Sequence, residues 1–150
     1  HGAAPAIRKA LEEGKTVLLD RYVYSNIAYQ CAKLKDPHRR ECLRNWIFRT
    51  EYGDFDLPEP DLNLFLDVPI GFVQQSLSQQ RAGADRSYLE GARDIHEASI
   101  SFQKTVRELY VGETRRDPHF LRVDCADENG RMLPPEAIFE RVKAVVDQVL

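Results

Sequence analysis

The sequence predicts an α/β fold in which helices flank a parallel sheet. Short apolar runs alternate along the chain with segments whose apolar residues recur about every 3.6 positions, the period of a helix. This alternation indicates a parallel sheet, because parallel strands are usually joined by a helix. A chain of 150 residues can bury one sizeable core, and we see no internal repeat or interdomain linker. We therefore predict a single domain over residues 1–150.

The elements of the first half follow from these two patterns. Apolar residues at helical spacing between residues 6 and 11 predict a first helix, which ends at Gly14. The run TVLLD at residues 16–20 is predicted to be a short buried strand that ends on an acid. Two further helices are expected at about residues 25–35 and 37–52.

The second half contains the clearest strand, DLNLFLDV at residues 61–68, with prolines on both sides. A helix is expected near residues 72–77, and it leads into QRAGADRSYLEGARD at residues 80–94, which has no periodicity. The remaining predicted elements are a helix at about residues 94–112, a strand at residues 119–125 and an amphipathic helix at residues 134–150.

Polar residues follow the first predicted strand, where ligands collect in parallel sheets. The carboxylate of Asp20 could orient a metal-bound water, and the guanidinium of Arg21 could hold a phosphate with two hydrogen bonds. Asn26 and Gln30 are four residues apart on one helix face, with Tyr29 close by, so an amide and a phenol could read a base edge and a sugar. The alternative is an ion pair that caps a strand, followed by an ordinary amphipathic helix.

Two further tyrosines, Tyr22 and Tyr24, lie off the Asn26 face by helical phase. We predict that they pack in or near the core.

Arginines gather in the loop at residues 80–94, which contains Arg81, Arg86 and Arg93. A flexible loop with several guanidinium groups could close over a polyphosphate and neutralise charge as it transfers. A solvated basic loop has the same composition and is the alternative.

Other polar groups carry weaker signals. Asp94 and Glu97 fall in the first turn of a predicted helix, where the helix dipole favours acids whatever their function. His96 has no partner histidine, so we expect no metal site there. The loop ADENGR after the last strand includes Ala126 and Asp127 and could contact a base, although most such loops are only turns.

Together these segments resemble the thymidylate kinase family, over essentially all of residues 1–150. DRYVYSNIAYQ is similar to the family's Asp-Arg-Tyr signature and the helix behind it, and LPEPDLNLFLDVP is similar to its Pro-Asp strand. The arginine-rich loop with DIHE resembles its lid and the following helix, although RSYLEG makes this lid longer than in many relatives. The resemblance implies a P-loop nucleoside monophosphate kinase fold and transfer of the ATP γ-phosphoryl group to dTMP, with Mg²⁺.

The resemblance also implies a role for each matching residue. Arg21 would hold the dTMP phosphate, and Asp20 would lie near the metal or its water. Asn26 would face the thymine with Gln30 nearby, and Tyr29 would pack where a ribose 2'-hydroxyl would fall. The other implied site residues are the lid cations Arg81, Arg86 and Arg93, the acceptor-side residues Asp94, His96 and Glu97, and an adenine loop with Ala126 and Asp127.

One departure from the family concerns the phosphate loop, because GxxxxGK[ST] does not occur in the sequence. Gly14-Lys15-Thr16 lies at a helix end before a strand, the reverse of the required order, and Lys9 stands where the first glycine would be. In the family this loop and a central strand precede the position of His1. We therefore expect the chain to be a fragment that lacks this segment. Alone it should be inactive and weakly stable, with two unpaired sheet edges.

Charge and cysteine content limit the other possibilities. Lys and Arg number 21 against 24 Asp and Glu, a net charge of -3, which argues against a broad nucleic-acid or membrane-binding surface. Three cysteines without CxxC spacing suggest reduced thiols in a cytoplasmic protein, and we see no leader or membrane-spanning run. We expect ATP and dTMP as ligands and a homodimer as the assembly.

Two alternatives stay open. The first is a non-catalytic α/β module with a helical dimer surface formed by residues 3–13 and 37–52. The second is a deoxynucleoside kinase, a related fold that also carries an acid and an arginine at a strand end. The spacing Asn26-x-x-Tyr29 and the DIHE helix favour the monophosphate kinase.

Overall fold

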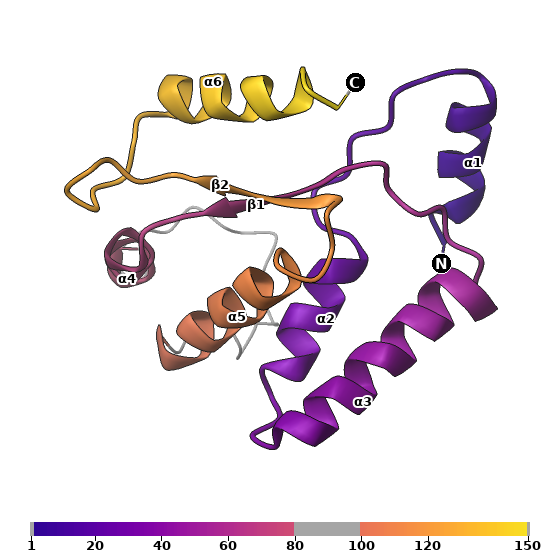
Figure 1. The fold of residues 1–150 in the computed structure, drawn as a ribbon, viewed down its shortest axis with the longest axis horizontal. Coiled ribbons are helices and arrows are strands. Elements are labelled where there is room, and N and C mark those ends of the chain that lie inside the picture. Colours follow the sequence, from indigo (N-terminus) through magenta and orange to yellow (C-terminus); the bar gives the residue numbers. More distant parts are fainter. Residues whose placement is uncertain (1, 80–99, 150) are drawn as a thin grey trace. The chain divides into compact units, whose positions relative to one another are not determined.

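A computed structural model describes residues 2–79 and 100–149. The predicted lid and acceptor-side residues Arg81, Arg86, Arg93, Asp94, His96 and Glu97 lie outside these ranges. The described chain forms two compact units, His1–Asp61 and Leu62–Leu150. In chain order the elements are α1 (Ala4–Glu12), α2 (Val23–Cys31), α3 (Pro37–Phe48), the π-helix η1 (Arg49–Asp54), β1 (Asn63–Asp67), α4 (Ile70–Gln79), α5 (Ile100–Glu113), β2 (Phe120–Asp124) and α6 (Pro135–Val146), as Figure 1 shows.

The N-terminal unit is built from α1, α2, α3 and η1. Gly14 adopts a φ of 72° directly after α1, which confirms the predicted helix end, since glycine reaches this left-handed region without strain. The N-cap of α3 is Asp36, whose carboxylate accepts a hydrogen bond of 3.0 Å from the His38 amide. The core of the unit comes mostly from α2, which packs on α3, and includes Val23, Tyr24, Ile27, Ala28, Cys31 and Ile47.

The predicted strand at residues 16–20 is wrong. The structure places these residues in no strand, and the side chain of Leu18 is 95% exposed. An apolar run becomes a strand only when a neighbouring strand takes up its backbone hydrogen bonds. Within the described ranges, the sheet consists of β1 and β2 and includes no residue of this segment. Residues 15–19 are therefore an irregular connection between α1 and the start of the α2 region.

The C-terminal unit confirms the two other predicted strands and their parallel pairing. The register runs from Asn63 opposite Phe120 to Asp67 opposite Asp124, so both strands end on an acid at the same edge. Helices α5 and α6 lie on opposite sides of the strand pair (Figure 1). On the α5 side, the Tyr110 ring stacks on Phe65 with centroids 4.8 Å apart and planes 13° apart.

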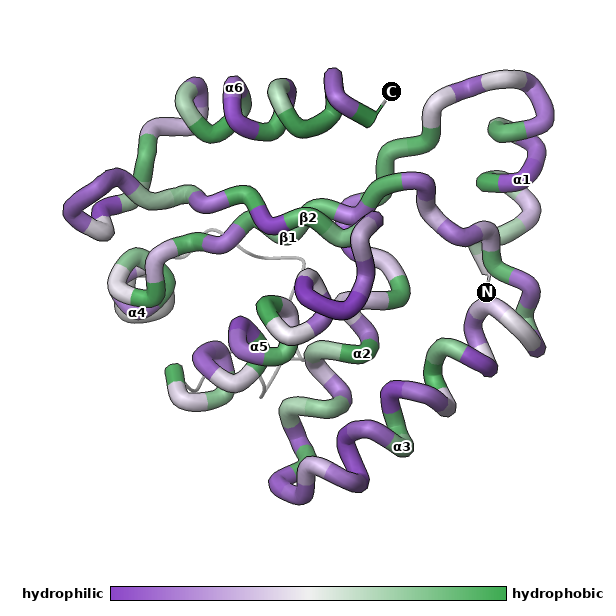
Figure 2. The backbone as a smooth tube through the Cα atoms, viewed as in Figure 1, coloured by the Kyte–Doolittle hydropathy of each residue, from purple (hydrophilic) through white to green (hydrophobic). Residues whose placement is uncertain are grey.

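Hydropathy along the chain follows these contacts. Helix α3 is hydrophilic over most of its length (Figure 2), and Ile47 is its buried residue. Helix α6 carries Phe139 on its surface, with 62% of that residue exposed. The buried residues of β2 are Phe120 and Val123, and Cys125 just beyond the strand is also buried. No helix in the two described ranges is long and apolar enough to cross a membrane.

Candidate functional site

Arg21 has a backbone conformation that is unusual for an arginine. Its φ is 69°, in the left-handed region, where Cβ approaches the carbonyl oxygen at a cost of roughly 1 to 2 kcal/mol. Among the described non-glycine residues only Arg21 and Asp56 have a positive φ. Such conformations persist where the surrounding structure holds them, and they cluster at functional sites. The structure thus marks Arg21 independently of any sequence motif.

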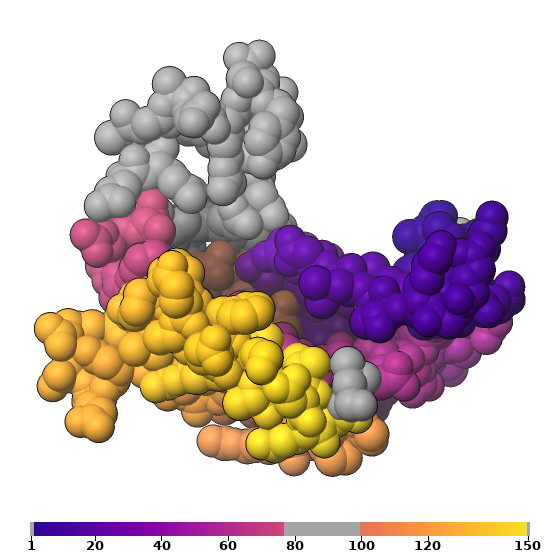
Figure 3. Space-filling model, turned by 90° about the horizontal axis from the view of Figure 1, so that it is seen from above, coloured from indigo at the N-terminus to yellow at the C-terminus, as the bar shows by residue number. Residues whose placement is uncertain are grey.

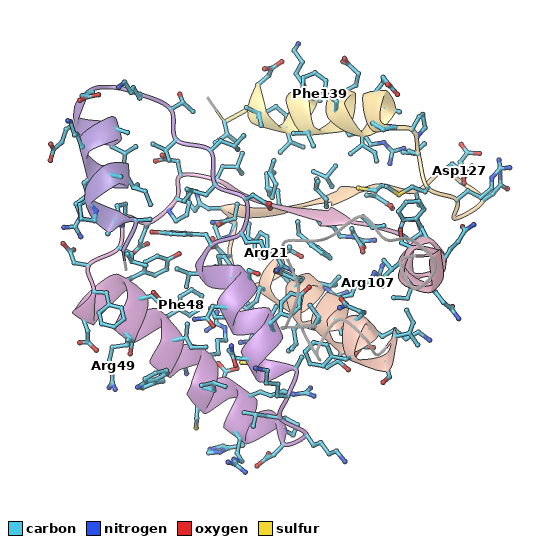
Figure 4. The ribbon with its side chains drawn as sticks, turned by 180° about the vertical axis from the view of Figure 1, so that it is seen from behind. Arg21, Phe48, Arg49, Arg107, Asp127 and Phe139 are labelled. Carbon is cyan, nitrogen blue, oxygen red and sulfur yellow. The ribbon has the colours of Figure 1, made fainter. Side chains whose placement is uncertain are left out.

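The side chain of Arg21 contacts Tyr29 in two ways. Its Nη2 donates a hydrogen bond of 2.7 Å to the Tyr29 hydroxyl, and its Cζ lies 4.7 Å from the centroid of the Tyr29 ring. The second contact is a cation–π interaction, which is worth about 0.5 to 1 kcal/mol at an exposed site. Arg21 is exposed and lies at the start of α2 (Figure 4). The predicted pair of arginine and tyrosine is therefore brought together, in a geometry suited to an anion.

Asn26 and Gln30, predicted to share a face, have different surroundings. Asn26 is partly buried, and its Nδ2 donates a hydrogen bond of 3.0 Å to Oε1 of Glu51. Gln30 is exposed, and its Oε1 accepts a hydrogen bond of 2.8 Å from Lys33 Nζ. Asp20 is also exposed. Of this set, Asn26 is the residue that the fold fixes in place.

Glu51 was not among the predicted site residues. It lies on η1, 25 positions from Asn26, so no local spacing in the sequence points to their contact. Gly53 follows Tyr52 and indicates only an ordinary helix end, so no sequence signal shows that the winding changes there.

Tyr22 and Tyr24 pack inside the N-terminal unit, as predicted. The Tyr22 hydroxyl donates a hydrogen bond of 3.0 Å to the Pro58 carbonyl oxygen. Burial raises the pKa of Tyr22, and the nearby charge of Glu51 raises it further, while Arg8 lowers it. Tyr24 is buried, and its ring meets the Phe48 ring edge to face, with the two centroids 5.4 Å apart.

The loop after β2 is a tight turn closed on itself. Ala126 forms an antiparallel bridge with Met132, and the Asp127 carboxylate accepts hydrogen bonds from the backbone amides of Arg131 and Asn129. The hydrogen bond from the Arg131 amide is the largest cause that lowers the pKa of Asp127. The Arg131 guanidinium and the Asn129 amide lower this pKa further. The loop stands out at the edge of its unit (Figure 3). The contact of Ala126 and Asp127 with a base stays a prediction.

A second charged cluster lies at the end of β1. The Asp67 side chain is 1% exposed and binds Arg107 through two hydrogen bonds, Nε to Oδ1 at 2.5 Å and Nη2 to Oδ2 at 2.8 Å. Arg122 Nε lies 2.6 Å from the same Oδ2. Hydrogen bonding to Asp67 raises the pKa of Arg107, so this guanidinium stays charged. Figure 4 shows Arg107 between α5 and the strands, so the cluster joins the helix to the sheet.

The described residues build no metal centre of their own. No group of three or more His, Cys, Asp or Glu side chains in residues 2–79 and 100–149 is arranged to hold a metal ion. The possible role of Asp20 beside a metal-bound water therefore stays a prediction.

Comparison with known proteins gives one family. A family model described as thymidylate kinase matches residues 2–132. The thymidylate kinase of Thermomicrobium roseum is 36% identical over 146 residues, which cover 96% of this chain and 60% of that protein. The thymidylate kinase of Limosilactobacillus fermentum is 30% identical over 128 residues, which cover 85% of this chain and 54% of that protein. The probable thymidylate kinase of Pyrococcus horikoshii is 35% identical over 105 residues, which cover 70% of this chain and 42% of that protein. The chain thus spans 42% to 60% of the length of these relatives.

Proposed function

The chain belongs to the thymidylate kinase family, and from this premise we propose that the protein transfers the γ-phosphoryl group of ATP to dTMP, giving dTDP and ADP. The observation that carries the proposal is the geometry of Arg21, the arginine of the Asp-Arg-Tyr signature. Its left-handed backbone and its contacts with Tyr29 support an anion-binding role. A nucleoside monophosphate offers the anion in the form of its phosphate.

In this proposal Arg21 holds the acceptor phosphate through two parallel N–H···O bonds, which fix both its position and its orientation. Tyr29 supports the guanidinium with its hydroxyl and its ring. The same ring fills the space beside the sugar C2', so that a ribonucleotide is disfavoured. Asn26 faces the thymine, and Gln30 lies at the margin of the site.

The proposal includes Mg²⁺, which enters with ATP and neutralises charge on the phosphates when bound. The carboxylate of Asp20 is exposed and offers the oxygen that this hard cation, or a water on it, prefers. The lid cations Arg81, Arg86 and Arg93 and the acceptor-side residues Asp94, His96 and Glu97 complete the proposed site, and the loop at Ala126 and Asp127 borders the adenine. We further propose that the protein is cytoplasmic and forms a homodimer. Light scattering on the purified protein would test the dimer.

The experiment is an acceptor assay on the product of the complete reading frame that contains this chain. Release of ADP from ATP and Mg²⁺ is followed with dTMP, with thymidine and without an acceptor. We expect release with dTMP that exceeds both other reactions by at least about 100-fold. Release with thymidine instead would identify a deoxynucleoside kinase and would refute the proposal, as would the absence of any dTMP-dependent release.

A further inference from the structure

The hydrogen bond between Asn26 and Glu51 determines more than the position of a side chain. An ionised carboxylate only accepts hydrogen bonds, whereas an amide donates through its nitrogen and accepts through its oxygen. The atom of Asn26 that faces Glu51 must therefore be Nδ2, as the 3.0 Å contact shows. The opposite orientation would place two acceptor oxygens against each other. The Glu51 carboxylate therefore determines which end of the Asn26 amide points away from it.

The end that points away is the acceptor. In residues 2–79 and 100–149, Asn26 Oδ1 receives no hydrogen bond from the protein. Asn26 is partly buried, and in these ranges its Oδ1 is not among the buried side-chain atoms that lack a partner, so this oxygen keeps accessible surface for a ligand. The site offered by Asn26 therefore accepts a hydrogen bond and selects a donor.

Glu51 is itself firmly held. Its carbonyl oxygen accepts a hydrogen bond of 3.0 Å from the Leu57 amide, and the preceding Thr50 carbonyl accepts one of 2.8 Å from Phe55. The neighbouring Tyr52 ring stacks on Phe48 with centroids 5.8 Å apart. The π-helical winding of η1 is rare in proteins and occurs often at functional sites, where it aims a side chain that a regular helix would turn elsewhere.

We propose that Glu51 is a positioning residue for base selection: it orients the Asn26 amide so that Oδ1 faces the base and favours a pyrimidine whose N3 carries a hydrogen. The inference rests on the proposed function, in which Asn26 faces the thymine. Thymine and uracil have a donor at N3, whereas cytosine has an acceptor there. Cytosine would meet Oδ1 with two acceptors in contact, and neither would be satisfied.

The test compares three acceptors, dTMP, dUMP and dCMP, in the product of the complete reading frame. Glu51→Met removes the acceptor at similar length and frees the amide to rotate. Glu51→Gln retains an oxygen that can accept from Asn26 Nδ2. Glu12→Met is the matched control, because Glu12 is an exposed carboxylate on α1 of the same unit.

We expect Glu51→Met to lower the ratio of kcat/KM for dTMP over dCMP by about tenfold, a typical loss of discrimination for one polar contact. Glu51→Gln should keep the ratio within about threefold, and Glu12→Met should not change it. The ratio of dTMP over dUMP should stay constant in all variants, because both bases carry the N3 hydrogen. A purely structural role would lower all three activities together.

An unchanged ratio of kcat/KM for dTMP over dCMP in folded Glu51→Met would overturn the inference. Glu51 would then have only a structural role, linking η1 to α2. If Glu51→Met does not fold, Glu51→Asp withdraws the carboxylate by one methylene and keeps the charge, and the ratio should then fall at least about threefold. No fall in Glu51→Asp would equally overturn it. If the wild-type protein phosphorylates dTMP and the ratio of kcat/KM for dTMP over dCMP is the same in the Glu51 variants, the inference fails and the proposed function stands. If the wild-type protein does not phosphorylate dTMP, the proposed function itself fails.

Discussion

Arg21 combines a constrained backbone with a constrained side chain, and its replacement tests the acceptor site most directly. Arg21→Ala should lower kcat/KM for dTMP by about 30- to 1000-fold, because a charge-assisted, two-bond contact worth roughly 2 to 4 kcal/mol is lost. Arg21→Lys should recover little of this, because an ammonium group cannot reproduce the planar fork. Steady-state kinetics with varied dTMP would measure both. Unchanged kinetics in a folded Arg21→Ala would remove Arg21 from the site.

Tyr22 should contribute a pH-dependent part of the stability. Its pKa in the folded protein is raised above the ordinary value of about 10, chiefly by burial, so folding favours the neutral phenol. The stability from this shift is fully present below about pH 10 and is lost as the pH rises through the folded-state pKa. Tyr22→Phe cannot ionise and should show a shallower loss of unfolding free energy above pH 10. Urea unfolding of both proteins between pH 7 and 11 would show this, and parallel curves would contradict it.

At this scale the sequence predicted the residues whose chemistry is visible in a local pattern. The Asp-Arg pair, Asn26 and Tyr29 lie within a few residues of one another, so their spacing on a helix could be judged. Glu51 could not be found this way, because its partner lies 25 positions away and the contact depends on how η1 folds back. Asp67 was missed for the same reason, since Arg107 is 40 positions from it.

Among the elements, β1, β2 and α5 depend on the buried carboxylate of Asp67. Asp67→Asn would leave two guanidinium groups without their shared counter-charge. We expect a loss of about 1 to 3 kcal/mol of unfolding free energy, below the usual value for a buried pair because Arg107 and Arg122 are each 41% exposed. Asp147→Asn breaks an exposed pair with Lys143 on α6 and should cost less than about 1 kcal/mol. Equal losses in the two variants, measured by denaturant unfolding, would show that Asp67 is not a structural anchor.

The elements that the sequence predicted correctly carry their own end signals. Gly14 ends α1, and prolines begin α3 and α6, so their boundaries depend on local backbone chemistry. The strands β1 and β2 were predicted from their apolar runs, and they are strands in the structure because each pairs with the other. Residues 16–20 have the same apolar pattern, but a pattern does not state whether a partner strand lies alongside. Pairing is a property of the sheet and not of the segment.

The whole molecule must bring a lid to the transferring phosphoryl group if the proposed function is correct. Arg81, Arg86 and Arg93 should then act mainly on the transition state, so replacing each by alanine should lower kcat more than it raises KM for dTMP. The size of the loss should be about tenfold or more for at least one position. Single-turnover and steady-state rates of the three variants would measure this. Effects on KM alone would indicate a solvated basic loop.

The left-handed backbone at Arg21 also bears on how this protein can evolve. A folded domain is stable by only about 5 to 15 kcal/mol, so the roughly 1 to 2 kcal/mol held at this one residue is a noticeable share of the margin. Glycine would relieve that strain and would also remove the guanidinium. Selection for stability alone would therefore favour the loss of this side chain, and only selection for activity would retain it. If the proposed function is correct, stability and activity conflict at this position, and a variant that is more stable here should be less active.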